Sequence, residues 1–104
     1  MSFPHRNFIA FDWNGTLVPF FGIDPYPGAL NVLSNLRKKS MPIFVVSRAS
    51  TFEIETDVKR VGFDFDGIYG CTDKLSVLSN LRMQYGRGVY VGDLAADARA
   101  AIAA

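Results

Sequence analysis

Several residues of this 104-residue chain have side chains that could handle a phosphoryl group, and each follows a short apolar segment. They are Asp12, Ser47, Lys74 and Asp93, with Asp97 one helical turn beyond Asp93. A carboxylate can attack phosphorus to form an aspartyl-phosphate, which divides a hydrolysis into two easier steps. A hydroxyl and an ammonium can stabilise the charge on the transferring oxygens. Further carboxylates are ligands that Mg²⁺ accepts.

The first of these residues ends an apolar segment and is followed at once by a turn. The sequence from Asp12 to Leu17 reads DWNGTL. The Asn-Gly pair is a strong turn signal, so we expect the chain to swing away while Asp12 stays at the strand end. Thr16 in this turn and Arg48, the residue after Ser47, are further candidate substrate contacts; a plain surface role is equally compatible with Arg48.

Each candidate also has a purely structural interpretation. Asp12 could be a turn residue after a strand, and Ser47 could start the next helix. Asp97 could be a solvated residue in the first turn of a helix, where the helix dipole favours a negative charge. Lys74 competes with three lysines that have the pattern of solvated helix charges, namely Lys38, Lys39 and Lys59. The ordered set of candidates is what favours chemistry over these alternatives.

The elements that must position these residues alternate along the chain. Four strands are predicted, at 8–11, 43–46, 66–69 and 88–91. Between and after them, apolar spacing and capping residues predict four helices, at 28–39, 51–61, 73–86 and 94–104. Ser50 and Asp73 are the expected N-caps of the second and third helices. The aromatic residues Phe20, Phe21 and Tyr26 are expected in a short hairpin packed on the core.

This alternation predicts a single three-layer α/β domain over residues 1–104. A strand, a helix and a parallel strand joined by right-handed crossovers give a Rossmann-like fold with a mostly parallel sheet of about four strands. In such sheets ligands bind outside the carboxyl ends of the strands. Asp12, Ser47 and Asp93 lie at or just after the ends of predicted strands, and Lys74 starts the helix after the third strand, so we expect them to meet at that edge.

Composition excludes several classes of function. Hydrophobic residues make up 49% of the chain, which indicates a packed domain and argues against disorder. The net charge is +1 and the basic residues are scattered, so neither nucleic acid nor a membrane surface is predicted as a partner. The single cysteine, Cys71, cannot form an internal disulfide. Together with the lack of an apolar stretch long enough for a membrane span, it favours a cytoplasmic protein.

Four segments, in order, resemble the motifs of the haloacid dehalogenase (HAD) superfamily, most of whose members are Mg²⁺-dependent phosphatases. They are DWNGTL at 12–17, Ser47 closing IFVVS, Lys74, and VGDLAAD at 91–97. The resemblance implies the strand order 3-2-1-4. It also implies that Asp12 is nucleophile and metal ligand, that Ser47 and Lys74 hold the phosphate, and that Asp93 and Asp97 complete the Mg²⁺ site.

Asn14 departs from the family pattern. Phosphatases of the family usually carry a second Asp there as general acid and base, and an amide cannot transfer that proton. Because the family uses the backbone carbonyl of this residue as a metal ligand, Asn14 should leave metal binding nearly intact. The resemblance therefore implies a catalytic role for this position that Asn14 fills incompletely, with slow turnover for poor leaving groups.

The lengths of the connecting segments are a second point of comparison. The gaps from Asp12 to Ser47 and from Ser47 to Lys74 are too short for the cap domains that many relatives carry, so an open site is expected. Relatives usually continue into a fifth strand, whereas seven residues follow Asp97 here. We therefore expect the strand at 88–91 to be an edge strand, either because the chain is a truncated or minimal version of the fold or because a second subunit covers this edge in a homo-oligomer.

The leading hypothesis is a HAD-like Mg²⁺-dependent phosphohydrolase acting on a phosphorylated substrate. A second is a catalytically quiet phosphate- or metal-binding module that acts through a partner, which Asn14 favours. A third, a phospho-acceptor domain similar to bacterial receivers, fits less well. Receivers carry an acidic pair at the first strand and the acceptor Asp on a later one.

Overall fold

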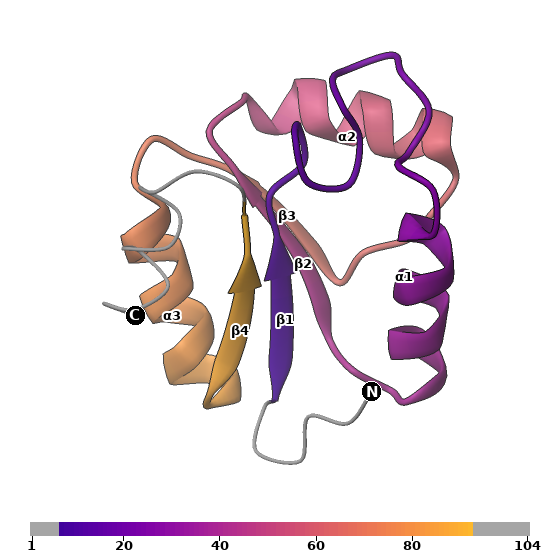
Figure 1. The fold of residues 1–104 in the computed structure, drawn as a ribbon. Helices are drawn as coiled ribbons and strands as arrows, with labels where there is room; N and C mark the ends of the chain where they lie inside the picture. The colour runs from indigo at the N-terminus through magenta and orange to yellow at the C-terminus, as the bar shows by residue number, and fades with distance from the viewer. Residues whose placement is uncertain (1–6, 93–104) are drawn as a thin grey trace.

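The sheet is built from the four predicted strands. The computed structural model describes residues 7–92. The strands are β1 (Phe8–Phe11), β2 (Ile43–Ser47), β3 (Gly67–Gly70) and β4 (Gly88–Val91). All pairings are parallel, and the order across the sheet is β3-β2-β1-β4 (Figure 1). The predicted fold class and strand order are confirmed.

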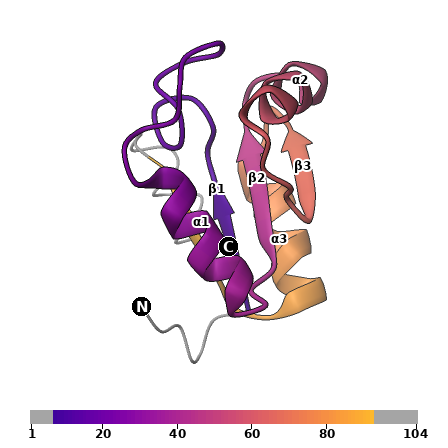
Figure 2. The same ribbon diagram turned by 90° about the vertical axis from the view of Figure 1, so that its right-hand side faces the viewer.

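Three helices cover the two faces of the sheet (Figures 1 and 2). They are α1 (Ala29–Lys38), α2 (Thr51–Val61) and α3 (Lys74–Tyr85). Buried residues of α1 and α2 share one hydrophobic cluster, whereas those of α3 belong to a second cluster. This is the arrangement that right-handed crossovers require for this strand order, because the chain moves outward through β2 and β3 and then returns past β1 to β4.

The central strands are apolar on both faces because each face is covered by helices. Along β1, Ile9 and Phe11 belong to the α1 and α2 cluster, while Phe8 and Ala10 belong to the α3 cluster. All four side chains are buried. By this alternation, the residue after Phe11 lies on the same side of the sheet as Ala10, toward α3.

Side-chain caps begin two of the helices as predicted. The Ser50 hydroxyl accepts a hydrogen bond from the Glu53 backbone N–H at 3.2 Å, and it donates to the Glu53 carboxylate at 3.0 Å. The Asp73 carboxylate accepts one from the Ser76 backbone N–H at 3.3 Å. The hydrogen bond from the Ser76 hydroxyl, and to a lesser extent the one from the Ser76 backbone N–H, lowers the pKa of the Asp73 carboxyl. The helix predicted at 94–104 lies outside the described residues.

The short hairpin expected around Phe20, Phe21 and Tyr26 is not formed, although Phe21 packs against the first hydrophobic cluster. Turns, rather than paired strands, occupy residues 19–23, and Phe20 is 62% exposed. Leu30 and Leu75, each in the first turn of its helix, are 40% and 39% exposed. Within residues 7–92, no helix is long and apolar enough to cross a membrane.

Candidate functional site

Asp12 and Lys74 form a buried ion pair at the carboxyl end of β1. Their side chains approach from β1 and from the first residue of α3, with 3.6 Å between Asp12 Oδ2 and Lys74 Nζ. Asp12 is 6% exposed and Lys74 is 3% exposed. The backbone N–H of Trp13 donates to Asp12 Oδ1 at 2.9 Å. Charged side chains are seldom buried unless paired, so the environment of Asp12 depends on this lysine.

Ser47 lies at the end of the neighbouring strand. It is the last residue of β2 and is 4% exposed. Phe11 pairs with Val45 in the parallel register, so Asp12 lies level with Val46. Ser47 therefore lies one residue beyond Asp12 in the direction of the strands. Its carbonyl accepts a hydrogen bond from the Cys71 N–H at 2.8 Å, which joins the ends of β2 and β3. Arg48, the next residue, is exposed.

The turn after Asp12 has the shape that its sequence predicts. Gly15 has a φ of 81°, which favours glycine, and its N–H donates to the Val18 carbonyl at 2.7 Å. Asn14 and Val18 form a bridge at the base of this turn. Two buried atoms in it, Asn14 Oδ1 and Thr16 Oγ1, have no hydrogen-bond partner among the described residues. Such atoms are uncommon in folded proteins and call for a ligand or water.

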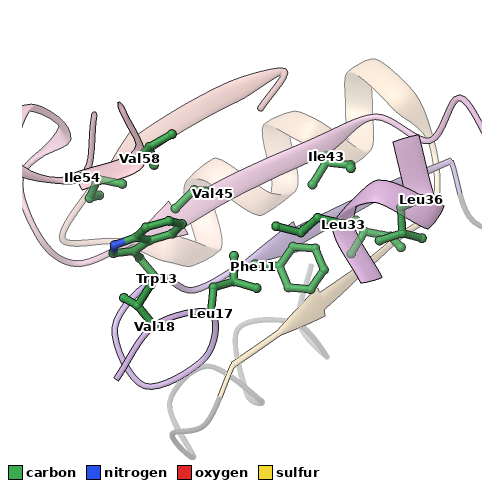
Figure 3. Packing of buried hydrophobic residues seen from close by; sticks show 11 residues of the cluster. Phe11, Trp13, Leu17, Val18, Leu33, Leu36, Ile43, Val45, Ile54 and Val58 are labelled. Atoms are coloured by element: carbon green, nitrogen blue, oxygen red, sulfur yellow. The ribbon is translucent and has the colours of Figure 1, made fainter. Parts of the chain in front are cut away.

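The same turn is fixed to the core by its apolar residues. Trp13, Leu17 and Val18 are 1%, 5% and 0% exposed, and all belong to the cluster under α1 and α2. Figure 3 shows the Trp13 ring beside Val18, with Val45 of β2 on its other side. Burying side chains of this size stabilises by roughly 1.5–3 kcal/mol each. The chain that follows Asp12 is therefore held in place by packing.

Asp57 of α2 also fixes this turn, and sequence reasoning did not identify it. Its carboxylate accepts hydrogen bonds from Trp13 Nε1 at 2.7 Å, from the Gly22 N–H at 3.0 Å and from Arg60 Nε at 2.8 Å. Burial alone raises the pKa of Asp57, but the bonds from Arg60, Trp13 and Gly22 outweigh it and lower that pKa. Arg60 also donates to the Ile23 carbonyl at 2.7 Å. A helical-spacing signal existed, because Asp57 lies three residues after buried Ile54 and immediately before buried Val58.

Tyr90 of β4 is a second residue that sequence reasoning missed. Its hydroxyl accepts a hydrogen bond from Lys74 Nζ at 2.8 Å and donates one to the Val46 carbonyl at 3.1 Å. A tyrosine in an apolar strand gave no signal of its own, since β-strands are rich in aromatic residues. Its contact with Lys74 depends on the order of the strands, which places β4 next to β1.

The remaining predicted metal ligands cannot be placed. Asp93 and Asp97 lie outside the described residues, which end at Gly92 directly after β4. Within residues 7–92 there is no cluster of three or more His, Cys, Asp or Glu side chains that could hold a metal ion. The described part of the candidate Mg²⁺ site therefore consists of Asp12 and the turn that contains Asn14.

An open cavity of about 640 Å³ lies between the loops that follow β2 and β3. Its walls are formed in part by Arg48, Ser50, Cys71 and Asp73. Burial raises the pKa of the Cys71 thiol, so this side chain stays protonated near neutral pH. The cavity is bounded by the residue after Ser47 and the residue before Lys74, which puts it beside the candidate site.

Comparisons with protein-family models, with characterised proteins and with solved structures give no match for this chain.

Proposed function

We propose that the protein is a HAD-like phosphohydrolase in which Asp12 attacks the phosphorus of a phosphorylated substrate. The observation that carries the proposal is the buried Asp12–Lys74 pair at the carboxyl end of β1. The strand order also switches at β1: β2 and β3 lie on one side of it, and the chain then crosses to β4 on the other side. Ligands of open α/β sheets bind at such a switch point.

The chemistry divides between three side chains. Asp12 Oδ would bond to phosphorus as the bond to the leaving oxygen breaks, and water would then cleave the aspartyl-phosphate to restore the carboxylate. Lys74 and Ser47 would stabilise the negative charge of the phosphoryl oxygens. Asn14 occupies the position near Asp12 that would transfer protons to the leaving group and from the attacking water, and its amide cannot do so. Alkyl leaving groups, which must be protonated, would therefore react slowly.

The residues present are compatible with Mg²⁺. Asp12 supplies a hard carboxylate ligand, and in the turn after it the buried side-chain oxygens of Asn14 and Thr16 have no hydrogen-bond partner within residues 7–92. Asp12, the backbone carbonyl of Asn14, Asp93 and Asp97 would hold the ion. When bound, Mg²⁺ supplies charge neutralisation for the phosphate and for the carboxylate that attacks it.

The substrate is proposed as a phosphate ester presented on a larger molecule. The segment from Asp12 to Ser47 contains one loop and α1, and that from Ser47 to Lys74 contains α2 and β3. Neither contains a domain that could close over a small metabolite. The open cavity beside Arg48 leaves room for a bulky leaving group, and the exposed guanidinium would favour an acidic one.

Hydrolysis of an aryl phosphate tests the proposal. The wild-type protein should turn over the substrate with Mg²⁺ and lose the activity when the ion is chelated. Asp12→Asn should abolish it, whereas the control Asp24→Asn should not, because the Asp24 side chain is fully exposed and far from the sheet end in sequence. Activity that survives Asp12→Asn, or no wild-type turnover at all, would contradict it.

A quiet binding module is the second candidate, and Asn14 is the observation that favours it. Such a module would bind Mg²⁺ and inorganic phosphate without turnover. In both cases millimolar Mg²⁺ should raise the melting temperature by mass action, and Asp93→Ala should remove the rise. A melting response combined with no hydrolysis of any phosphate ester would favour the binding module. A wild type with no response to Mg²⁺ would contradict the metal site in both.

A further inference from the structure

Tyr90 connects the candidate catalytic lysine to the backbone of the sheet. Its hydroxyl donates to the Val46 carbonyl of β2, so the lone pairs of the oxygen remain available to accept from Lys74 Nζ. The ammonium lies 5.3 Å from the centre of the Tyr90 ring, on the side of the hydroxyl. Lys74 is thus held by a group that is itself fixed.

A small residue makes this reach possible. Tyr90 comes from β4, and Val46 belongs to β2, with β1 between the two strands. The residue of β1 that pairs with Tyr90 is Ala10, whose side chain is fully buried on the same face. The tyrosine can cross β1 because Ala10 leaves space above the strand. A larger side chain at this position would displace the ring.

The two distances at Lys74 differ in a way that matters for chemistry. Nζ lies 2.8 Å from the Tyr90 oxygen but 3.6 Å from Asp12 Oδ2. The second distance is longer than the roughly 3.2 Å limit of a typical N–H···O hydrogen bond. A lysine in direct contact would hold the carboxylate in a tight ion pair and weaken it as a nucleophile.

We propose that Tyr90 is a positioning residue that holds the Lys74 ammonium away from direct contact with Asp12. Resting on the proposed phosphohydrolase function, this places the ammonium where it can contact a phosphoryl oxygen that lies beside the Asp12 carboxylate. Lys74 then stabilises the transferring group more than it stabilises the resting carboxylate. Interactions that are stronger in the transition state than in the ground state are the ones that accelerate a reaction.

Tyr90→Phe tests the proposal because it removes the hydroxyl and keeps the ring. Lys74 should then move onto Asp12. Losing a hydrogen bond to a charged group should lower kcat for an aryl phosphate by about 10- to 100-fold. KM should change by less than about threefold, since the effect is on the transition state. Tyr85→Phe is the matched control, because the Tyr85 ring packs in the same cluster against Phe44.

The position of Lys74 is read independently by nuclear magnetic resonance. The sequence contains four lysines, so their side-chain signals are few enough to assign. The wild type should show contacts between the Lys74 ε-protons and the Tyr90 ring, and the Lys74 signals should shift in Tyr90→Phe but not in Tyr85→Phe. Absence of the wild-type contact, or an unshifted Lys74 in Tyr90→Phe, would overturn the proposal.

The two readouts separate this proposal from the proposed function. An active wild type whose kcat is unchanged by Tyr90→Phe would overturn the role of Tyr90 and leave phosphohydrolase activity intact. An inactive wild type in which Lys74 nevertheless shifts in Tyr90→Phe would overturn the proposed function, while supporting the placement of Lys74 by Tyr90.

Discussion

Asp12 combines burial with a nearby cation, and its neighbours in the chain keep it at the end of β1. Trp13 contributes in two ways. Its backbone N–H donates a hydrogen bond to the Asp12 carboxylate, and its ring is packed in the core. Asn14 and Thr16 lie in the turn that follows, and their buried side-chain oxygens have no hydrogen-bond partner in the described part of the chain. At the scale of single residues, the proposed nucleophile is a buried carboxylate held at the strand end, and position 14 carries an amide.

Asn14→Asp should raise activity in a way that depends on the leaving group. General acid–base help contributes about 10²- to 10⁴-fold, or roughly 3–5 kcal/mol of barrier. The gain should be large for an alkyl phosphate, whose leaving oxygen needs a proton, and small for an aryl or acyl phosphate, which leaves as a stable anion. Turnover of one alkyl and one aryl phosphate with Mg²⁺ measures the difference. Equal small changes for both would mean that position 14 does not serve the leaving group.

Asp57→Asn should lower stability at neutral pH and alter its dependence on acid. The folded-state pKa of Asp57 lies below its ordinary value of about 4, so its charged form stabilises the fold above that pH. This stabilisation disappears as the pH falls through the folded-state pKa. Urea unfolding at pH 7 should show a loss of about 1–3 kcal/mol for Asp57→Asn, and the gap to wild type should narrow below about pH 4.

Glu55→Gln provides the control for this change, because Glu55 is an exposed carboxylate on the same helix. It should alter neither the stability at pH 7 nor the slope in acid by a comparable amount. The fluorescence of Trp13, the single tryptophan, reports on the same contact, since Asp57 accepts its indole N–H. An Asp57→Asn protein with wild-type fluorescence and stability would show that the network does not hold the turn.

At the scale of elements, periodicity and caps were sufficient to predict the described helices and strands. The spacing of Leu33 and Leu36, the Ser50 cap and the Asp73 cap are local signals, and each is found in the structure. The placement of Asp12, Ser47 and Lys74 after strands followed from the rule that parallel strands end at one edge. The strand order came from the resemblance, because the rules for crossovers alone allow more than one order.

What the sequence did not predict depends on contacts between distant elements. Asp57 binds Trp13 across 44 positions, and Tyr90 reaches Val46 across the same separation. Neither pair is visible from local periodicity. The loop at 19–28 shows neither the helical nor the strand period of apolar residues. Its aromatic residues led to the prediction of a hairpin, which was wrong.

The close approach of β3 to the start of α2 gives a prediction at this scale. A Cβ on Gly70 would lie well inside van der Waals contact of the Thr51 nitrogen and the Ala49 carbonyl oxygen, both of which are backbone atoms. Gly70→Ala should therefore destabilise the protein by about 1–3 kcal/mol through overpacking. Denaturant unfolding measures the loss.

Gly67→Ala serves as the comparison within the same strand. A Cβ there meets only side-chain atoms of Phe44 and Tyr69, the nearest at 3.0 Å, and these can shift. Its loss of stability should be clearly smaller. If the two substitutions cost the same, the approach of the β2–α2 loop to Gly70 would not be as close as described.

At the scale of the whole molecule, β4 is the outer strand of the described sheet beside β1. An apolar hollow of about 310 Å³ lies between β4, β1 and α1, with Phe11, Val32 and Val91 among its lining residues. Val32 and Val91 are 45% and 39% exposed. Among residues 7–92 no strand pairs with the outer edge of β4, and such an edge next to exposed apolar side chains favours pairing with another chain.

We therefore predict self-association through β4. Sedimentation should show dimers or larger species at micromolar concentrations, and Val91→Lys should shift them toward monomer, because a charge on an edge strand opposes pairing. Phe52→Lys, which changes an exposed apolar residue on α2, should leave the association unchanged. A wild type that sediments as a stable monomer would contradict the prediction.

Phosphorylation of Asp12 itself tests the account most directly. The protein would be incubated with acetyl phosphate and Mg²⁺, quenched in acid, digested and mapped by mass spectrometry. We predict a phosphoryl group on the Asp12 carboxylate in the wild type, accumulating because Asn14 cannot activate water, and none in Asp12→Asn. A wild type that turns over phosphate esters without modification of Asp12, or a phosphoryl group on a different residue, would contradict it.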